Sequence, residues 1–344
     1  MVNAMVNWGI AGTGWVARDY VAPAIMASAN GRLVASYDRD PAALTAMPDG
    51  PARCGDLAEF LATPGLEAVY VATPNHAHRA LVEAIAARGL AVLCEKPMAA
   101  TSADAEAMVA ACRRAGVCYG TAFDQRFHPA HREMARMIVA GALGAVFAVR
   151  IVYACWLPPD WSADNWRVDH NRAGGGALID LAPHGLDLAA MLLADTVTEI
   201  MAIGQQQIHG YSDPAVEDGA LLAARTANGV LIQSHVAYNC PDALPRRRLE
   251  IVGVAGQLVA TDTMGQVAGG TLVFTDAATG TSRDVEVPAA HRSPFLNQVE
   301  AFADHVRGAA FPSSPEADLH LMRMVARAQE MARPAGPLWQ GEAA

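Results

Sequence analysis

The chain has 344 residues, 52% of them hydrophobic, and a formal net charge of −10 at pH 7. This length predicts two domains with sizeable cores. The acidic balance excludes the basic stripe of a nucleic-acid surface, and no uninterrupted apolar run approaches the roughly 20 residues of a membrane span. The N-terminus lacks a basic region followed by an apolar stretch, so we expect no signal peptide. The six cysteines have no paired spacing, which favours reduced thiols in a cytoplasmic protein.

The first predicted element is a short apolar strand, Val6–Ala11, which turns on two glycines into a helix-compatible segment, 15–29. The turn has the pattern G-x-G-x-x-A. Gly12 allows a tight turn, Gly14 lets a pyrophosphate approach the backbone, and the small Ala17 lets helix and strand pack closely. The phosphates would bind the N–H groups of the helix start, where the helix dipole favours an anion. The residues expected to contact them are Gly12, Gly14, Trp15 and Val16.

A second apolar run, 33–37, ends in Asp38. An acid at the end of the second strand, about twenty residues after the glycines, suits a ribose 2′-hydroxyl. Together these features predict a nicotinamide-dinucleotide site. Asp38 favours NAD because a carboxylate repels the 2′-phosphate of NADP. Arg39 could instead accept that phosphate or stack on adenine, so NADP remains the alternative.

The rest of the first part alternates strands and helices, with helices over 57–62 and 78–88 and a third helix that begins after Thr101 and stops at Gly116. This pattern predicts a parallel, doubly wound sheet in a dinucleotide-binding domain over 1–124. Ligands of such sheets bind outside the carboxyl ends of the strands. Two motifs follow strands there: Thr73-Pro74-Asn75-His76 and Glu95-Lys96-Pro97.

Lys96 is the candidate for chemistry at this edge. Pro97 restricts the backbone of Lys96 to an extended conformation, which would direct its side chain towards the cofactor. A lysine near a bound nicotinamide can have its pKa lowered by burial and serve as a general acid or base. The alternative is an ordinary solvated surface lysine.

The pattern changes after residue 124. We expect a helix over 130–140, a strand over 145–155, an irregular loop over 156–176 and a long helix over Ala177–Leu193. Several strand-like runs on short turns follow, including a hairpin at Asn228-Gly229, and two helices close the chain. This predicts a second α/β domain over 125–344, with a large, mostly antiparallel open sheet that binds substrate and forms subunit contacts.

The long helix carries the second candidate site. Three glycines, 174–176, precede it and let the backbone approach a ligand or another chain closely. Asp180 and His184 are four residues apart and therefore share one helix face. Such a pair can orient an alcohol and relay its proton. The alternative is a buried histidine satisfied by a neighbouring carboxylate.

Two further patterns leave alternatives open. His76-x-His78 and the Asp180/His184 pair lack a third ligand at a characteristic spacing, so we expect no metal site. The loop 156–167 holds three of the six tryptophans, together with Asp, Asn and Arg side chains. Aromatic faces and polar groups suit a polyhydroxylated substrate, but these tryptophans could equally fill the core or a subunit contact.

With the glycine turn, Glu95-Lys96-Pro97 and G-G-G-x-x-x-D-x-x-x-H in this order, the chain resembles the Gfo/Idh/MocA oxidoreductases, relatives of glucose–fructose oxidoreductase and inositol dehydrogenase. The segments 72–76 and Gln125-Arg126-Phe127-x-Pro129 also resemble family motifs. The resemblance covers most of the chain. It implies a Rossmann domain followed by an α/β domain whose open sheet often forms the subunit interface, and hence a homodimer or homotetramer.

The resemblance also implies roles for single residues. Lys96 would contact the reacting hydroxyl and the nicotinamide ribose. His184 would be the acid/base or proton relay, and Asp180 would hold the substrate hydroxyl or position His184. The Lys96–Pro97 peptide is expected to be cis. The expected cofactor contacts are Gly12, Gly14, Trp15, Val16, Asp38, Arg39, Thr73, Pro74, Asn75, His76, Glu95, Lys96, Trp166 and Arg167, and the expected substrate contacts are Lys96, Arg126, Trp166, Asp180 and His184.

The sequence thus predicts an NAD(P)-dependent dehydrogenase or reductase acting on a sugar, polyol or cyclitol. Two other functions occur among the relatives that the resemblance brings in. One is a glycosidase that retains NAD and works by oxidation followed by elimination; glycoside cleavage without net reduction of added cofactor would identify it. The other is a non-catalytic cofactor-binding regulator. The set of Lys96, Asp180 and His184 argues against a regulator, which need not retain them.

Overall fold

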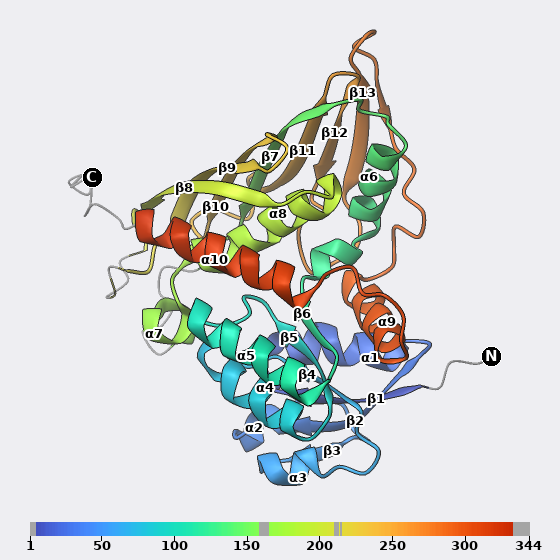
Figure 1. Ribbon diagram of the computed structural model, residues 1–344, viewed down its shortest axis with the longest axis vertical. Coiled ribbons are helices and arrows are strands. Elements are labelled where there is room, and N and C mark those ends of the chain that lie inside the picture. The colour runs from blue at the N-terminus through green and yellow to red at the C-terminus, as the bar shows by residue number, and fades with distance from the viewer. Residues whose placement is uncertain (1–4, 158–164, 210–212, 214, 333–344) are drawn as a thin grey trace. The chain divides into compact units, whose positions relative to one another are not determined.

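The computed structural model describes residues 5–157, 165–209, 213 and 215–332. The chain forms two compact units (Figure 1). The first contains Met1–Phe127 and Ser293–His320, and the second contains His128–Arg292 and Leu321–Ala344. The expected division into 1–124 and 125–344 differs from this in two respects: residues 125–127 and the segment 293–320 belong to the first unit.

The first unit is built on a six-stranded parallel sheet in the order β3-β2-β1-β4-β5-β6. The strand order reverses between β1 and β4, as in a Rossmann fold. Helices α4 and α5 pack together, and α1 packs with α9 (Figure 1). The elements are β1 (Val6–Ala11), η1 (Ala17–Val21), α1 (Ala22–Ala27), β2 (Gly31–Tyr37), α2 (Pro41–Thr45), β3 (Ala52–Cys54), α3 (Leu57–Leu61), β4 (Ala68–Val71), η2 (Asn75–Ala77), α4 (His78–Ala87), β5 (Ala91–Glu95), α5 (Ser102–Ala115), β6 (Tyr119–Ala122), η3 (Asp124–Phe127) and α9 (Pro294–Val306).

Helix α9 belongs to the hydrophobic core of the first unit although it lies far along the chain. Phe295, Val299 and Phe302 are buried in one cluster with residues of β1, β4, β5 and α1. The rings of Phe302 and Trp8, which is on β1, have centroids 5.6 Å apart. The amphipathic pattern of α9 predicts a helix, but it does not identify the sheet against which the apolar face packs.

Local signals explain most helix ends and one irregularity. Asp56 caps α3 by accepting from the N–H of Glu59 at 2.9 Å, and Thr101 caps α5 by accepting from Asp104 at 3.1 Å. The segment expected as one helix over 15–29 contains the π-helical turn η1 before α1. Pro23 has no N–H to donate there, which disturbs the regular helical ladder.

The second unit contains an eight-stranded sheet in the order β14-β13-β12-β11-β7-β10-β9-β8. All its pairs are antiparallel except β7 with β10. Helix α8 packs against β7, β9 and β10, and α6 packs on α8. The elements are α6 (Pro129–Val139), β7 (Val146–Ala154), η4 (Trp166–Val168), α7 (His170–Ala173), α8 (Ala177–Leu193), β8 (Val197–Gln205), β9 (Gly219–Thr226), β10 (Leu231–Ala237), β11 (Arg247–Gly253), β12 (Gly256–Thr261), β13 (Thr271–Asp276) and β14 (Ser282–Asp284); α10 (Pro315–Met331) begins in the first unit and ends in the second.

One sequence signal of the second unit is confirmed. Asn228-Gly229 joins β9 and β10, and the N–H of Thr226 donates to the carbonyl oxygen of Val230 across the turn at 3.0 Å. The stretch His170–Leu193 is the described helical segment whose length and hydropathy would suit a membrane span, but 78% of its most apolar window is buried. A helix that is apolar on all sides and buried in this way is a core helix.

A buried ion pair joins η3, which follows β6, to the first turn of α10. Arg126 donates from Nη2 to Oδ1 of Asp318 at 2.8 Å, and the two side chains are 5% and 1% exposed. The guanidinium lies 4.9 Å from the ring centroid of Phe123. Because both charges have left bulk water, loss of one would leave the other uncompensated.

We therefore predict that Asp318→Ala lowers the free energy of unfolding by about 3 kcal/mol, measured by urea denaturation. The matched control is Asp49→Ala, which removes an exposed pair with Arg53; the Asp49 side chain is 98% exposed. That change should cost less than about 1 kcal/mol. Equal losses of unfolding free energy in the two variants would show that the buried pair contributes no more to stability than the exposed pair.

Candidate functional site

The strands of the first unit end together at one edge of the sheet. Ala11 on β1 pairs with Tyr37 on β2 and with Val71 on β4. The register continues through β5 and β6, where Glu95 pairs with Ala122. Because the strands are parallel, the residues that follow them gather at this edge. They are the glycine turn 12–14, Asp38, the loop 73–76, Glu95-Lys96-Pro97 and Asp124.

The glycine turn fits a dinucleotide phosphate. Gly12 has φ +92°, and a Cβ there would lie 2.7 Å from the backbone nitrogen of Thr73. Only glycine allows the loops after β1 and β4 to pack this closely. A Cβ on Gly14 would meet nothing within 4 Å, and the helical segment begins at the next residue, Trp15. The backbone at Gly14 is therefore open to an anion at a helix start.

Asp38 is held beside this turn by its own chain. Its Oδ2 accepts from the backbone N–H of Thr13 at 2.8 Å and from the Thr13 hydroxyl at 3.0 Å. Its Oδ1 accepts from the N–H of Asp40 at 3.0 Å. Carboxylate oxygens have further lone pairs, so Asp38 can also accept from a ribose hydroxyl. Sequence reasoning gave Thr13 no role. Arg39, the next residue, is exposed.

The loop after β4 carries one polar group that suits a ligand. The Thr73 Oγ1 is buried and, within the described residues, makes no hydrogen bond. His78 ties this loop to the loop after β5, because its Nε2 lies 2.8 Å from the carbonyl oxygen of Thr73 and its Nδ1 lies 3.0 Å from that of Met98. Burial lowers the pKa of His78. Asn75 is buried, Pro74 is half-buried and His76 is exposed.

Lys96 is half-buried directly after β5, and the Lys96–Pro97 peptide is cis, as expected. Glu95 accepts from the Tyr70 hydroxyl at 2.7 Å and from the backbone N–H of Lys96 at 3.1 Å. Lys96 is also the only lysine in the chain; the other basic side chains are arginines. An ammonium differs from a guanidinium because its pKa shifts readily on burial. The side chain of Lys96 therefore differs chemically from all the arginine side chains of the chain.

Asp124 is a site residue that sequence reasoning missed. It follows β6 and is 4% exposed. Burial raises the pKa of Asp124 to about 7, repulsion from Glu95 adds to the increase, and Lys96 opposes it. Its position after a strand was the available signal. Arg126, expected to contact substrate, is 6% exposed and engaged with Asp318; its substrate contact stays a prediction.

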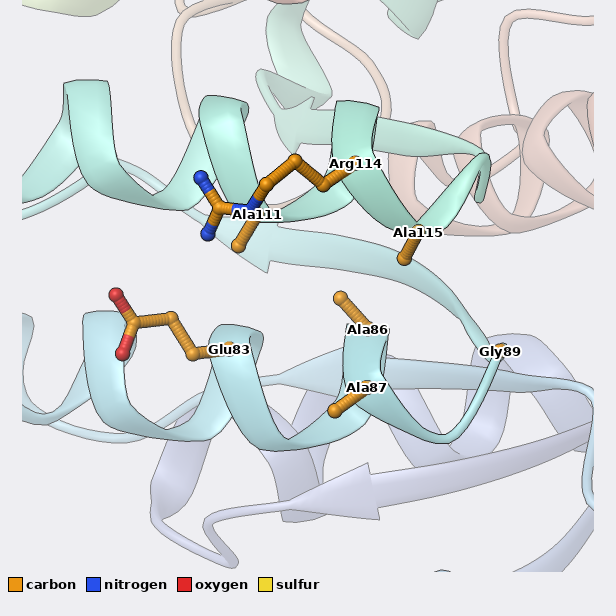
Figure 2. A pocket seen from close by; sticks show the side chains of 7 residues that line it. All are labelled: Glu83, Ala86, Ala87, Gly89, Ala111, Arg114 and Ala115. Carbon is orange, nitrogen blue, oxygen red and sulfur yellow. The ribbon is translucent and has the colours of Figure 1, made fainter.

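The hollow shown in Figure 2 does not belong to this edge. It lies between the carboxyl-terminal ends of α4 and α5 and is lined by small side chains such as Ala86, Ala87, Ala111 and Ala115. Helices in a parallel sheet run opposite to their strands. Their carboxyl-terminal ends therefore lie at the amino edge of the strands, away from the ligand edge.

In the second unit, the three glycines approach their own chain. A Cβ on Gly176 would overlap the carbonyl oxygen of Glu217, and the Gln329 amide donates to the carbonyl oxygen of Gly174 at 2.7 Å. The Glu217 carboxylate accepts from the N–H of Leu178 at 2.7 Å and from that of Gly176 at 3.1 Å. Burial raises the pKa of Glu217 to about 7, and these N–H donors oppose the increase. Glu217 thereby fixes the start of α8.

Asp180 and His184 lie on α8 as the spacing predicts. Asp180 is half-buried and accepts from the hydroxyl of Tyr238 at 2.8 Å. Burial, together with the Asp180 charge, raises the pKa of Tyr238 well above 10, so this hydroxyl remains a donor. His184 is 4% exposed, and its ring meets Tyr153 edge to face with centroids 5.4 Å apart. Sequence reasoning found neither tyrosine.

Trp166 and Arg167 belong to the same region of the second unit. Asn165 caps η4 by accepting from the N–H of Arg167 at 3.1 Å, and the guanidinium lies 4.5 Å from the Trp166 ring centroid. Arg167 also lowers the pKa of the Tyr238 hydroxyl, although burial dominates there. Arg167 therefore acts electrostatically on the Tyr238 hydroxyl, which donates to Asp180. Trp161 of the same loop lies outside the described residues.

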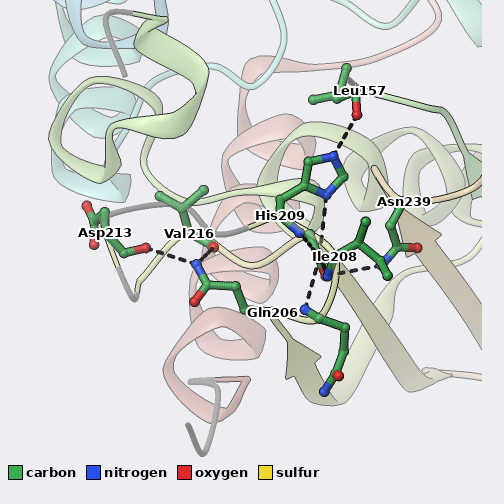
Figure 3. Close-up of polar contacts among 9 residues, drawn as sticks. Leu157, Gln206, Ile208, His209, Asp213, Val216 and Asn239 are labelled. Atoms are coloured by element: carbon green, nitrogen blue, oxygen red, sulfur yellow. Dashed lines mark hydrogen bonds and ion pairs between the residues drawn. The ribbon is translucent and has the colours of Figure 1, made fainter. Parts of the chain in front are cut away.

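A second polar network holds the start of this loop (Figure 3). Nε2 of His209 lies 2.6 Å from the carbonyl oxygen of Leu157, and Nδ1 lies 3.4 Å from Oδ2 of Asp218. The same carboxylate oxygen accepts from three consecutive backbone N–H groups, 207–209, and Oδ1 accepts from Asn239 at 3.1 Å. Asp213 accepts from the N–H of His170 at 3.1 Å. His209 thus holds Leu157, and Asp213 holds His170.

Among the described residues, no group of three or more His, Cys, Asp or Glu side chains could hold a metal ion. His78, considered above as half of a His-x-His pair, bonds backbone carbonyls instead. The glycine turn and Asp38 fit a nicotinamide dinucleotide.

Comparisons with known proteins agree with this geometry. Residues 6–123 match an oxidoreductase family with an NAD-binding Rossmann fold, and residues 131–259 match the GFO/IDH/MocA C-terminal domain. The 1,5-anhydro-D-fructose reductase of Ensifer adhaerens is 32% identical over 91% of this chain and 92% of its own length. Inositol 2-dehydrogenase 1 of Saccharopolyspora erythraea is 31% identical over 73% of this chain and 72% of its own length.

A solved structure shows the same fold over nearly the whole chain. The aldose-aldose oxidoreductase from Caulobacter crescentus, complexed with glycerol, has a TM-score of 0.85 at 24% identity and covers 96% of this chain and 98% of its own. The glycine turn, the Lys96 edge and the α8 pair are therefore parts of a known architecture. The chain belongs to the Gfo/Idh/MocA family and is an NAD(P)-dependent oxidoreductase.

Proposed function

We propose that the enzyme transfers a hydride between nicotinamide and the hydroxyl- or carbonyl-bearing carbon of a sugar, polyol or cyclitol. Relatives that carry names such as 1,5-anhydro-D-fructose reductase and inositol 2-dehydrogenase support this substrate class. The observation that carries the proposal is Lys96, the only lysine of the chain, held at the carboxyl edge that also carries the open glycine turn. The bound nicotinamide supplies the hydride chemistry, and the protein supplies position and electrostatics.

The first unit supplies most of the cofactor contacts in this proposal. The backbone at Gly12 and Gly14 and the helix start at Trp15 receive the phosphates, since N–H groups at a helix start bind anions. Asp38 accepts from the adenosine ribose hydroxyl while it continues to bond Thr13. The other proposed contacts are Val16, Arg39, Thr73, Pro74, Asn75, His76, Glu95, Lys96, Trp166 and Arg167.

The proton chemistry is assigned to three side chains. Lys96 donates a hydrogen bond to the reacting oxygen and stabilises negative charge that develops there. His184 takes the hydroxyl proton in oxidation and returns it in reduction. Asp180 orients the substrate hydroxyl or His184, and the Tyr238 hydroxyl, at 2.8 Å, holds the Asp180 carboxylate in place. Trp166 and Arg126 are also assigned to the substrate.

The first prediction of this proposal concerns Lys96→Met. The change removes the ammonium and keeps a similar side-chain length, so turnover should fall at least about 100-fold, the scale of acid–base and electrostatic contributions. NAD affinity, measured by calorimetric titration, should change little by comparison. Lys96→Arg is the matched control, because it keeps the positive charge but replaces the compact ammonium group with a guanidinium. Undiminished turnover of the Met variant would remove Lys96 from the mechanism.

The second prediction concerns cofactor choice. The carboxylate of Asp38 lies beside the glycine turn and repels a 2′-phosphate, so the enzyme should bind NAD more tightly than NADP. Asp38→Ser should weaken NAD binding and reduce the difference between the NAD and NADP affinities, because Ser keeps a hydrogen-bonding group without the charge. Titration of each variant with both cofactors measures this. Comparable affinities of the unaltered enzyme would show that Asp38 does not select the cofactor.

We also propose that the outer face of the eight-stranded sheet forms a homodimer or homotetramer contact. Along β8, β9 and β10, buried and exposed residues alternate, so one face is covered and the other is open. Ile203 on β8 pairs with Leu221 on β9. A contiguous exposed apolar area of this kind marks an interaction surface. The exposed apolar residues on these strands and on β7 are Phe147, Met201, Ile203, Leu221 and Leu231.

The corresponding prediction is that Ile203→Glu weakens assembly. The Ile203 side chain is 73% exposed in the isolated chain, so a charge there should leave the folded unit intact but oppose burial in a contact. Sedimentation velocity should show a shift to smaller species. Met26→Glu, at another exposed apolar position, is the control. A monomeric unaltered protein would contradict the proposed assembly.

A further inference from the structure

Asp124 is a buried carboxyl group to which the proposed reaction gives no role. It lies two residues after Ala122, and Ala122 pairs with Glu95 across β6 and β5. Lys96 follows Glu95 directly. Asp124 and Lys96 therefore leave adjacent parallel strands at the same edge of the sheet. With 4% exposure, Asp124 has lost most of its contact with water, so its charge depends on its neighbours.

The charged groups that act on Asp124 come from β5 and the residue after it. Glu95 opposes the Asp124 carboxylate, and Lys96 stabilises it. Tyr70 on β4 donates to Glu95 at 2.7 Å, and its own pKa is well above 10, chiefly through burial, so it remains a neutral donor. The backbone N–H of Lys96 also donates to Glu95. These two donors hold the Glu95 carboxylate in place beside Lys96.

The remaining neighbours of Asp124 are neutral or already paired. Gln125 donates to Oδ2 of Asp124 at 3.0 Å. Gln298 of α9, in the amide orientation that satisfies both groups, accepts from the backbone N–H of Asp124 at 3.1 Å. Arg126 is close in sequence, but it forms the buried pair with Asp318. The cation that acts on Asp124 is therefore Lys96.

We propose that Asp124 is a positioning residue for Lys96: the buried Asp124 carboxyl group and the half-buried Glu95 carboxyl group together hold the ammonium group of Lys96 and keep it charged. This inference rests on the role proposed above for Lys96. The interaction is reciprocal, so a lysine that stabilises the Asp124 carboxylate is stabilised by it to the same degree.

The sign of the pH dependence follows from the neighbours of Asp124. Burial is the main reason that its pKa is raised to about 7, so its carboxylate forms as the pH rises through that value. Below this range Asp124 is neutral and does not stabilise the charge of Lys96, and above it the Asp124 carboxylate does. Removing the Asp124 charge should therefore lower the pKa of Lys96, and the effect should be present above pH 7 and lost below it.

The test uses the fact that the chain has a single lysine. Labelling with lysine that carries ¹³C at Cε gives one side-chain NMR signal, and its shift against pH reports the charge of Lys96 without any need for activity. In the unaltered protein the signal should show a small step near pH 7, from Asp124, before the main titration. In Asp124→Asn the small step should vanish, and the main titration should move down by about one pH unit.

Matched variants separate positioning from a general effect. Asp124→Glu restores the carboxyl group and should recover most of the shift. Asp49→Asn removes an exposed charge of the first unit and should leave the Lys96 titration unchanged. The log(kcat/KM) profile of Asp124→Asn should shift in the same direction as its NMR titration, whereas NAD binding should persist. If Asp124→Asn does not fold, the step near pH 7 in the unaltered protein is the deciding observation.

Two outcomes would overturn the inference. One is a Lys96 titration that is the same in Asp124→Asn as in the unaltered protein. The other is a small step near pH 7 that is missing from the unaltered protein or that persists in Asp124→Asn. Neither depends on turnover, so failure here is distinguishable from failure of the role of Lys96, which the Lys96→Met kinetics decide.

Discussion

The common register of the parallel strands is the constraint on which the first unit depends. Backbone pairing from β2 to β6 makes the strands end level with one another, so five short segments far apart in sequence meet at one edge. None of these segments could place a functional group alone. Gly12 makes the edge compact by allowing the loops after β1 and β4 to touch, and Gly14 leaves it open to a phosphate.

Two adjacent carboxylates perform the equivalent task in the second unit. Glu217 accepts from the first N–H groups of α8 and thereby fixes the helix that carries Asp180 and His184. Asp218 accepts from backbone N–H groups 207–209 and, through His209, fixes Leu157. Buried carboxylates are costly unless they are bonded in this way. Here the hydrogen bonds of Glu217 fix the backbone of the helix that carries the candidate residues Asp180 and His184.

The sequence predicts the parts of this protein that local patterns encode. Alternating apolar runs, the glycine turn and the capping residues locate nearly every strand and helix, and Asp38, Lys96 and Asp180 follow from motifs. Residues that act through distant partners could not be predicted. Tyr238 meets Asp180 across 58 positions, and α9 covers a sheet that begins at Val6. Such contacts depend on strand register and packing, which periodicity does not specify. β3 has three residues and is too short to show a pattern.

The most direct test of the central claim is the initial rate of nicotinamide absorbance change with the purified enzyme. It would be measured across sugars, sugar acids and cyclitols, with NAD and NADP in parallel. The account predicts reduction of NAD by at least one polyhydroxylated compound and a slower rate with NADP. The contradicting result has two parts. The protein would bind NAD but none of these compounds would reduce it, and the protein would cleave a glycoside without net reduction of the cofactor.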